Sequence, residues 1–222
     1  NKIDLNGKWL LKQQGAEDTI PATVPGCVHT DLLANKKIPD PYVQDNEAIS
    51  QWIGETDWIY QRTFRVDETF LQHNKILLQC EGLDTLAAIQ INGHLIGKTD
   101  NMFRSWEFDV KQYLKIGENR IEIRFKTTIP IITRKQKENF LNHSGLDNHH
   151  RISGGNWIRK EQCNFGWDWG PKLVTCGIWR SISLAGIEEG RLLTLHCQQN
   201  HKRKRVDLSL ETTIESIGRS KQ

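Results

Sequence analysis

Methionine and tyrosine are scarce in this chain, and long apolar runs are absent from it. Its 222 residues include one methionine, three tyrosines and six prolines. No segment approaches the ~18 consecutive apolar residues of a membrane-spanning helix. The Gly-rich loop of phosphate-binding proteins and the Gly-x-Ser-x-Gly motif of serine hydrolases are also missing. The sequence therefore predicts neither a membrane protein nor an enzyme of those two classes.

An excess of charge of one sign is missing too. The 30 Lys and Arg residues are nearly balanced by 27 Asp and Glu residues, which leaves a net charge of +3. This balance does not favour nucleic acid or an anionic surface as the main partner. The eight tryptophans are the unusual feature of the composition. An indole offers a flat apolar face and a polar N–H edge, so these residues suit either a carbohydrate-binding surface or a protein core.

The cysteines match neither a disulfide framework nor a Cys-x-x-Cys metal site, because they are odd in number and widely spaced. They are Cys27, Cys80, Cys163, Cys176 and Cys197. We expect buried free thiols, with Cys163 and Cys176 the one pair close enough in sequence for a bridge. The chain begins at Asn1 without an initiator methionine or a signal peptide, which indicates a trimmed or mature protein and leaves its localisation unknown.

Short segments of alternating apolar and polar residues dominate residues 1–186 and predict an all-β fold. The clearest are Trp106–Val110 and Arg120–Lys126, and Asn92-Gly93 between two apolar runs is a strong hairpin signal. Further expected strands are Trp58–Val66, Lys75–Cys80, Lys172–Cys176 and Trp179–Leu184. Helices are expected only near residues 28–33 and 133–141. About eight short strands fit a jelly-roll β-sandwich over residues 1–186.

The pattern changes after Gly186. Residues 206–214 alternate without interruption, and Leu192–Cys197 is predicted to be the strand before them. Two strands cannot bury an apolar face by themselves. Residues 187–222 are therefore expected to open a second, immunoglobulin-like sandwich domain that is truncated here.

Two long loops, residues 34–57 and 139–171, exceed the usual length of a connection and are expected to be functional. The second loop ends in Trp167-Asp168-Trp169-Gly170-Pro171, where the glycine and proline restrict the backbone. An indole covers the C–H face of a pyranose, and a carboxylate accepts hydrogen bonds from adjacent hydroxyls. The alternative is structural: the indoles anchor the loop to the core, and Asp168 caps backbone N–H groups.

Two other clusters have weaker functional interpretations. His143, Asp147, His149 and His150 lie close together, but their spacing matches no defined metal site, so a solvated loop and no bound metal are expected. The basic run 201–205 precedes an alternating strand and is expected to form a solvated turn without binding nucleic acid. No pair of carboxylates stands out as the acid and nucleophile of a glycosidase.

Several motifs, in register over residues 1–185, resemble the N-terminal region of the β-mannosidases of glycoside hydrolase family 2. They are Val24-Pro25-Gly26-Cys27-Val28-His29-Thr30-Asp31-Leu32-Leu33, Ile38-Pro39-Asp40-Pro41-Tyr42, Trp52-Ile53-Gly54-Glu55-Thr56-Asp57-Trp58, Gly82-Leu83-Asp84-Thr85, Asn92-Gly93, Asp100-Asn101-Met102-Phe103 and the run from Arg159 to Pro171.

This resemblance implies a multidomain enzyme that removes terminal, non-reducing β-D-mannose residues with retention of configuration. Its first domain is a galactose-binding-like jelly roll, its second an immunoglobulin-like sandwich, and a (β/α)₈ barrel carries the two catalytic glutamates. Because the barrel is missing, no catalytic residue is expected in this chain, and the 222 residues alone are predicted to be inactive. No cofactor is implied.

The resemblance also suggests substrate-binding residues, since a loop of the first domain reaches over the barrel mouth in related enzymes. Asp168 is expected to bind hydroxyls of the terminal mannose, Trp167 to wall the pocket, and Trp169 to act mainly in structure. Asn46 is a weaker candidate by analogy with the β-galactosidase branch. Such residues position the substrate and perform no bond chemistry.

The expected partners are β-mannosides, either manno-oligosaccharides or Man-β-GlcNAc from N-glycans, bound together with the missing barrel. Two alternatives remain open. The chain is a stand-alone carbohydrate-binding module, or it is the same domain from a family 2 enzyme with β-galactosidase-like or exo-glucosaminidase-like specificity.

Overall fold

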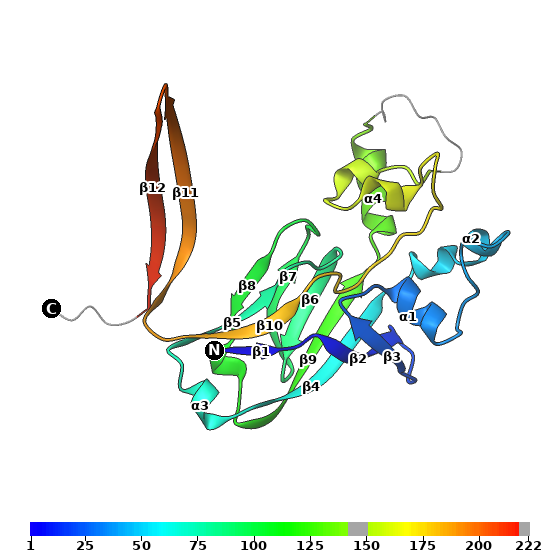
Figure 1. The fold of residues 1–222 in the computed structure, drawn as a ribbon. Coiled ribbons are helices and arrows are strands. Elements are labelled where there is room, and N and C mark those ends of the chain that lie inside the picture. The colour runs from blue at the N-terminus through cyan, green and yellow to red at the C-terminus, as the bar shows by residue number, and fades with distance from the viewer. Residues whose placement is uncertain (142–150, 218–222) are drawn as a thin grey trace.

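The chain folds into an all-β sandwich from which a long hairpin projects (Figure 1). A computed structural model describes residues 1–141 and 151–217. The larger sheet has six strands in the order β3 (Ile20–Val24), β2 (Gly7–Gln13), β4 (Trp58–Val66), β9 (Gly117–Lys126), β6 (Leu86–Ile91) and β7 (His94–Thr99). The smaller sheet has four strands in the order β1 (Lys2–Asp4), β10 (Ile182–Ile187), β5 (Lys75–Cys80) and β8 (Trp106–Asp109). All pairings within these two sheets are antiparallel.

One apolar core fills the space between the two sheets. Alternate residues of β9 are buried, and Ile121, Ile123 and Phe125 have exposed fractions of 0–1%. The residues between them face outward, as the period of two in a half-buried strand requires. Tyr60 from β4 and Leu78 from β5 are fully buried in the same cluster, so both sheets contribute to it. This packing confirms the predicted two-sheet sandwich.

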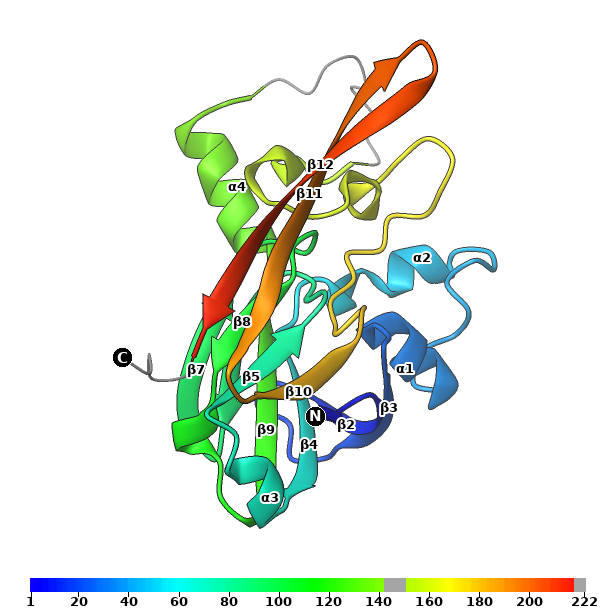
Figure 2. The same cartoon turned by 60° about the vertical axis from the view of Figure 1, so that its left-hand side comes forward.

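The helices are short and lie in the connections. They are α1 (Val28–Ala34), α2 (Asn46–Ile49), α3 (Glu68–Leu71) and α4 (Ile129–Glu138), together with the 3₁₀ turns η1 (Gln51–Ile53), η2 (Lys111–Tyr113), η3 (Gly155–Trp157) and η4 (Gln162–Phe165). Figures 1 and 2 show α1, α2, α4 and the 151–181 segment gathered at one end of the sandwich, away from α3. This loop-rich end contains all the predicted site residues.

Several local predictions are confirmed. Strands form at Trp58–Val66 and Lys75–Cys80 with the expected bounds. Asn92 and Gly93 form the β6–β7 turn with φ angles of 51° and 85°. These positive values explain the residue types, because asparagine and glycine tolerate the left-handed region.

Other predictions were wrong. Lys172–Cys176 forms no strand, because its backbone pairs with other elements: Lys172 O accepts from Gln51 Nε2 at 2.8 Å, and Cys176 O accepts from Val28 N at 2.8 Å. The strand expected at 179–184 begins only at Ile182, and the helix expected at 133–141 covers Ile129–Glu138. Three strands within residues 1–24 were not predicted.

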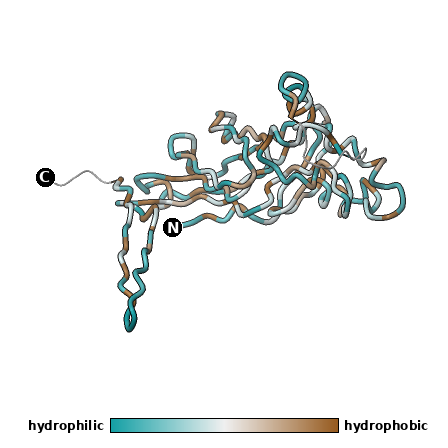
Figure 3. Tube along the Cα trace, turned by 90° about the horizontal axis from the view of Figure 1, so that it is seen from above, coloured by the Kyte–Doolittle hydropathy of each residue, from teal (hydrophilic) through white to brown (hydrophobic). Residues whose placement is uncertain are grey.

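Residues 190–216 form a two-stranded sheet of β11 (Gly190–Lys202) and β12 (Arg205–Ser216) that stands away from the sandwich (Figure 3). The turn between β11 and β12 lies within the basic run 201–205, which confirms the predicted turn. Ion pairs at its base join it to β5 and β8: Lys75 Nζ lies 2.6 Å from Glu215 Oε1, and Arg191 Nη2 lies 2.7 Å from Glu107 Oε2. Among the described residues, these ion pairs attach the hairpin to the sandwich at its base.

The five cysteines are free thiols, so no bridge joins Cys163 and Cys176. The expectation that they are buried holds for Cys80 alone, because three of the others are half-buried and Cys197 on the hairpin is exposed. Burial raises the pKa of the Cys80 thiol, which is surrounded by apolar core. In the described ranges 1–141 and 151–217, the longest helices fall short of the length and apolarity needed to cross a membrane.

Candidate functional site

The run Trp167-Asp168-Trp169-Gly170 forms a tight turn at the loop-rich end, which we call the tip. An isolated antiparallel bridge between Trp167 and Gly170 closes it. Gly166 precedes it with a φ of 109°, a conformation that other residues rarely adopt. The backbone thus presents Asp168 and Trp169 at the outer end of the turn.

The tip leaves its polar and aromatic groups accessible. Trp169 is 73% exposed, Asp168 is exposed, and Trp167 is half-buried. The two indole rings lie 6.2 Å apart at 52°. The Arg151 guanidinium lies 4.4 Å from the Trp167 ring centre, and its Nε donates to Gly166 O at 2.8 Å. Arg151 therefore fixes the base of the tip through a cation–π contact and a backbone bond.

Asp168 forms no hydrogen bond or ion pair with any residue of the described part of the chain. The structural alternative, in which its carboxylate caps backbone N–H groups, therefore does not hold for these residues. An exposed carboxylate on a restrained turn can accept hydrogen bonds from a ligand. Its role in sugar binding remains a prediction.

Asn46 is half-buried at the first position of α2, and its side chain already has a structural partner. Its Nδ2 donates to Asp40 O at 2.8 Å, which closes the preceding loop. The same short helix and the turn η1 meet the segment after the tip: Lys172 N donates to Glu47 Oε1 of α2 at 3.0 Å, and Gln51 Nε2 of η1 donates to Lys172 O at 2.8 Å. The structure thus brings the two predicted loops together, through Glu47 and Gln51, which sequence reasoning missed.

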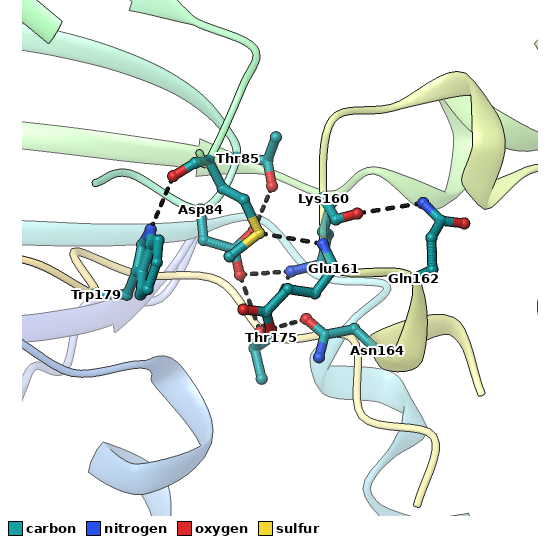
Figure 4. Close-up of polar contacts among 9 residues, drawn as sticks. Asp84, Thr85, Lys160, Glu161, Gln162, Asn164, Thr175 and Trp179 are labelled. Atoms are coloured by element: carbon teal, nitrogen blue, oxygen red, sulfur yellow. Dashed lines mark hydrogen bonds and ion pairs between the residues drawn. The ribbon is translucent and has the colours of Figure 1, made fainter. Parts of the chain in front are cut away.

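A cluster of polar side chains joins the segments before and after the tip to the turn that follows β5 (Figure 4). Lys160, with a side chain 0% exposed, forms an ion pair with Asp84, which follows β5 in the turn 81–85. Thr175 Oγ1 lies 2.9 Å from Asp84 Oδ2 and 3.0 Å from Asn164 Oδ1, and it accepts from Lys160 Nζ at 3.2 Å. Thr85 Oγ1 donates to Asp84 Oδ1. We call Asp84, Lys160, Thr175 and Asn164 the buried polar cluster.

His29 on α1 lies close enough to this cluster to be affected by its charges. It is 6% exposed, and its Nδ1 has no hydrogen-bond partner among residues 1–141 and 151–217. Burial, together with the positive charge of Lys160, lowers the pKa of His29 to about 4, and Asp84 opposes this only partly. The imidazole is therefore neutral at physiological pH.

The described residues offer little other chemistry. No group of three potential His, Cys, Asp or Glu metal ligands occurs among residues 1–141 and 151–217. The four residues of the predicted histidine loop, His143, Asp147, His149 and His150, lie outside the described residues. Two open hollows of about 490 and 580 Å³ lie on the six-stranded sheet, and neither is lined by residues of the tip.

Comparison with known proteins identifies relatives of this arrangement. Residues 9–180 match the family described as "Glycosyl hydrolase 2 galactose-binding domain-like". The goat (Capra hircus) β-mannosidase is 36% identical over 186 residues, which cover 82% of this chain and 21% of that protein. The chain therefore spans about a fifth of the length of this curated relative.

Solved structures share the fold. The crystal structure of a β-D-mannosidase from Dictyoglomus thermophilum is 40% identical and has a TM-score of 0.89, covering 97% of this chain and 26% of that one. An exo-chitosanase from Amycolatopsis orientalis has a TM-score of 0.70 at 16% identity, covering 97% of this chain and 24% of that one. The second similarity shows the fold alone.

Proposed function

The chain belongs to glycoside hydrolase family 2 as the galactose-binding-like N-terminal domain of a β-mannosidase, and we propose from this that it forms one wall of that enzyme's sugar-binding site. The full-length protein is proposed to release terminal, non-reducing β-D-mannose with retention of configuration. Its acid and nucleophile lie outside residues 1–222. Manno-oligosaccharides and Man-β-GlcNAc are the proposed substrates.

One observation carries the proposal: Asp168, an exposed carboxylate without a partner in the described chain, lies between two indoles on a restrained turn. Hydroxyls of a pyranose would donate to Asp168, while its C–H face would contact Trp167. The sequence suggested a mainly structural role for Trp169. Because its side chain is exposed, we propose that it also contacts the sugar. Asn46 keeps its Oδ1 for a sugar hydroxyl, because only its Nδ2 bonds Asp40.

The first test is Asp168→Ala in the full-length protein, assayed on an aryl β-mannoside. We expect kcat/KM to fall about 10²-fold, because hydrogen bonds to a charged group contribute roughly 1.5–3 kcal/mol each. The matched control is Asp18→Ala, which removes an exposed carboxylate elsewhere and should leave kcat/KM unchanged. Normal kinetics for the Asp168 variant would remove this residue from the site.

Residues 1–222 alone are proposed to have no turnover, since neither catalytic glutamate is among them. The strongly exposed Trp169 favours one second candidate, a stand-alone carbohydrate-binding module. Calorimetric titration of residues 1–222 with mannose and mannobiose separates the two: tight binding supports the module, and turnover by this chain contradicts the enzyme-wall proposal. A panel of aryl β-mannoside, β-galactoside and β-glucosaminide assayed with the full-length protein decides its specificity.

Residues 1–186 are proposed as one domain and 187–222 as the opening of an immunoglobulin-like sandwich. The support is the row of exposed apolar side chains on β11 and β12, which a two-stranded sheet cannot bury.

A further inference from the structure

We propose that Asp84 is a positioning residue for the tip and that it acts by holding both arms of the tip loop with one carboxylate. This inference rests on the proposed sugar-binding role of Asp168. The first arm, residues 159–166, enters the tip, and the second, residues 171–177, leaves it. Neither arm belongs to a sheet, so contacts between side chains and turns decide where the tip lies.

The first arm is held through Lys160. Its ammonium group is completely buried and is paired with Asp84, and Thr175 is its second hydrogen-bond acceptor. Truncating either charge of a buried pair leaves the other buried without compensation, which is strongly unfavourable. The position of Lys160 is therefore strongly restrained, and Trp167 follows it by only seven residues.

The second arm is held by the same carboxylate. Thr175 Oγ1 lies 2.9 Å from Asp84 Oδ2, the oxygen that also pairs with Lys160. The Asp84 backbone forms two further hydrogen bonds with the second arm: Asp84 N donates to Gly177 O at 2.9 Å, and Gly177 N donates to Asp84 O at 3.1 Å. Asp84 thus connects the arms at a point between the sandwich and the tip.

A second turn, residues 100–103, also contacts the first arm and the chain just after the second arm. Met102 N donates to Arg159 O at 3.0 Å, and Glu161 N lies 3.2 Å from Met102 Sδ. Two residues beyond the second arm, Trp179 Nε1 donates to Met102 O at 3.1 Å. Met102 contributes no charge to these contacts. Of the two turns that contact the arms, only the one containing Asp84 can be weakened by neutralising a charged side chain. Asp84 is therefore the position at which a single substitution tests the hypothesis.

The test is a double-mutant cycle in the full-length protein on an aryl β-mannoside. If Asp84 acts by placing Asp168, Asp84→Asn should lower kcat/KM roughly 10-fold or more, because misplacement by about 1 Å can cost up to 10²-fold. In a protein that already carries Asp168→Ala, the same substitution should lower kcat/KM less than about 2-fold. If Asp84 only stabilised the fold, the losses in kcat/KM from the Asp84 and Asp168 substitutions would multiply in the double variant.

Thr175→Val provides a milder variant if Asp84→Asn does not fold, since it removes one hydroxyl at nearly constant volume. It should show the same overlap with Asp168→Ala. The matched control is Asp31→Asn: this buried carboxylate accepts from Thr23 N at 2.9 Å and from Tyr60 Oη at 2.8 Å, and neither donor belongs to an arm. Asp31→Asn should change kcat/KM by the same factor in the native protein and in the Asp168→Ala protein.

The outcomes separate the two proposals. If Asp168→Ala lowers kcat/KM but the Asp84 and Thr175 losses simply add to it, or if neither variant loses activity, the positioning role is wrong and the sugar-binding role stands. If Asp168→Ala behaves like the native enzyme, the sugar-binding role is wrong and the positioning role fails with it.

Discussion

At the scale of single residues, the sandwich places ionisable groups where water cannot reach them. His29 is the clearest case, because it belongs to an apolar helix face and still carries a titratable ring. Its neutral form is favoured by burial and by the nearby positive charge of Lys160. A histidine in this position should make folding sensitive to acid.

For residues 1–222, we expect the free energy of unfolding to fall as the pH drops from about 6.5 to 4. Over this range His29 is protonated in the unfolded chain but neutral in the folded one, so acid favours unfolding. The fall from a pKa of 6.5 to about 4 corresponds to about 3 kcal/mol at pH 4. Urea unfolding of the native chain and of His29→Gln at several pH values measures it.

The control for this measurement is His94→Gln, which changes an exposed histidine on β7. The native chain and the His94 variant should lose stability in parallel, and the His29 variant should lose less. Equal pH dependence in all three chains would show that His29 does not carry the effect.

At the scale of elements, partly exposed ion pairs attach the hairpin of β11 and β12 to the sandwich, whereas the Asp84–Lys160 pair near the tip is buried. Arg191 donates to both carboxylate oxygens of Glu107, at 2.8 and 2.7 Å, and to Glu215 Oε2 at 2.7 Å. The bonds from Arg191 hold the pKa of Glu107 below its usual range, and Lys75 and Arg191 lower that of Glu215. These carboxylates therefore stabilise the attachment above their ordinary pKa of 4.5, and the stabilisation is lost as the pH falls through the lowered values.

Arg191→Met should loosen this attachment. Because these ion pairs are partly exposed, we expect a loss of about 1 kcal/mol, seen as roughly 5-fold faster amide hydrogen exchange in residues 187–191. Lys202→Met is the control, since it breaks the ion pair with Asp207 (2.6 Å) near the far end of the hairpin. Unchanged exchange at 187–191 in the Arg191 variant would show that backbone contacts alone fix the hairpin.

At the scale of the whole molecule, two parts extend from the sandwich: the loop-rich end and the hairpin (Figures 1 and 2). One face of the hairpin carries a row of apolar or weakly polar side chains that we call the apolar stripe. Its members are Leu192, Leu195, Cys197, Val206, Leu208, Leu210 and Ile214. A contiguous stripe of this kind favours association with another apolar surface.

Replacing Leu208 and Leu210 with threonine should reduce the binding of an apolar dye by residues 1–222. Both leucines are 62% exposed, and they are two of the seven members of the stripe. We expect dye fluorescence to fall by roughly a quarter to a third. The control is Ser209→Thr with Glu211→Gln, which alters the opposite face of β12; equal dye binding in both variants would contradict the role of the stripe.

Much of the sandwich is predictable because its signals are local. The alternation in Arg120–Lys126 and the residue types at Asn92-Gly93 depend only on the period of a strand and on allowed φ angles. The glycines and proline around the tip similarly predict a restrained turn. These inferences needed no knowledge of distant neighbours.

Other features depend on contacts between residues far apart in sequence. Asp84 and Lys160 are 76 positions apart, and neither carries a pattern that distinguishes a buried pair from two solvated charges. The sequence of Lys172–Cys176 resembles a strand, yet its backbone forms hydrogen bonds with residues of α1 and η1. Hydrogen-bond partners of this kind are decided by packing.

The sequence by itself determined that this chain forms a β-sandwich with a rigid tryptophan–aspartate turn, because side-chain period and backbone restriction act over a few residues. Only the tertiary structure decided that the turn is exposed, that both of its arms meet at Asp84, and that His29 is buried beside them. These properties depend on segments far apart in the sequence that pack together and exclude water from the polar groups between them. Local sequence patterns do not show which segments will pack against each other.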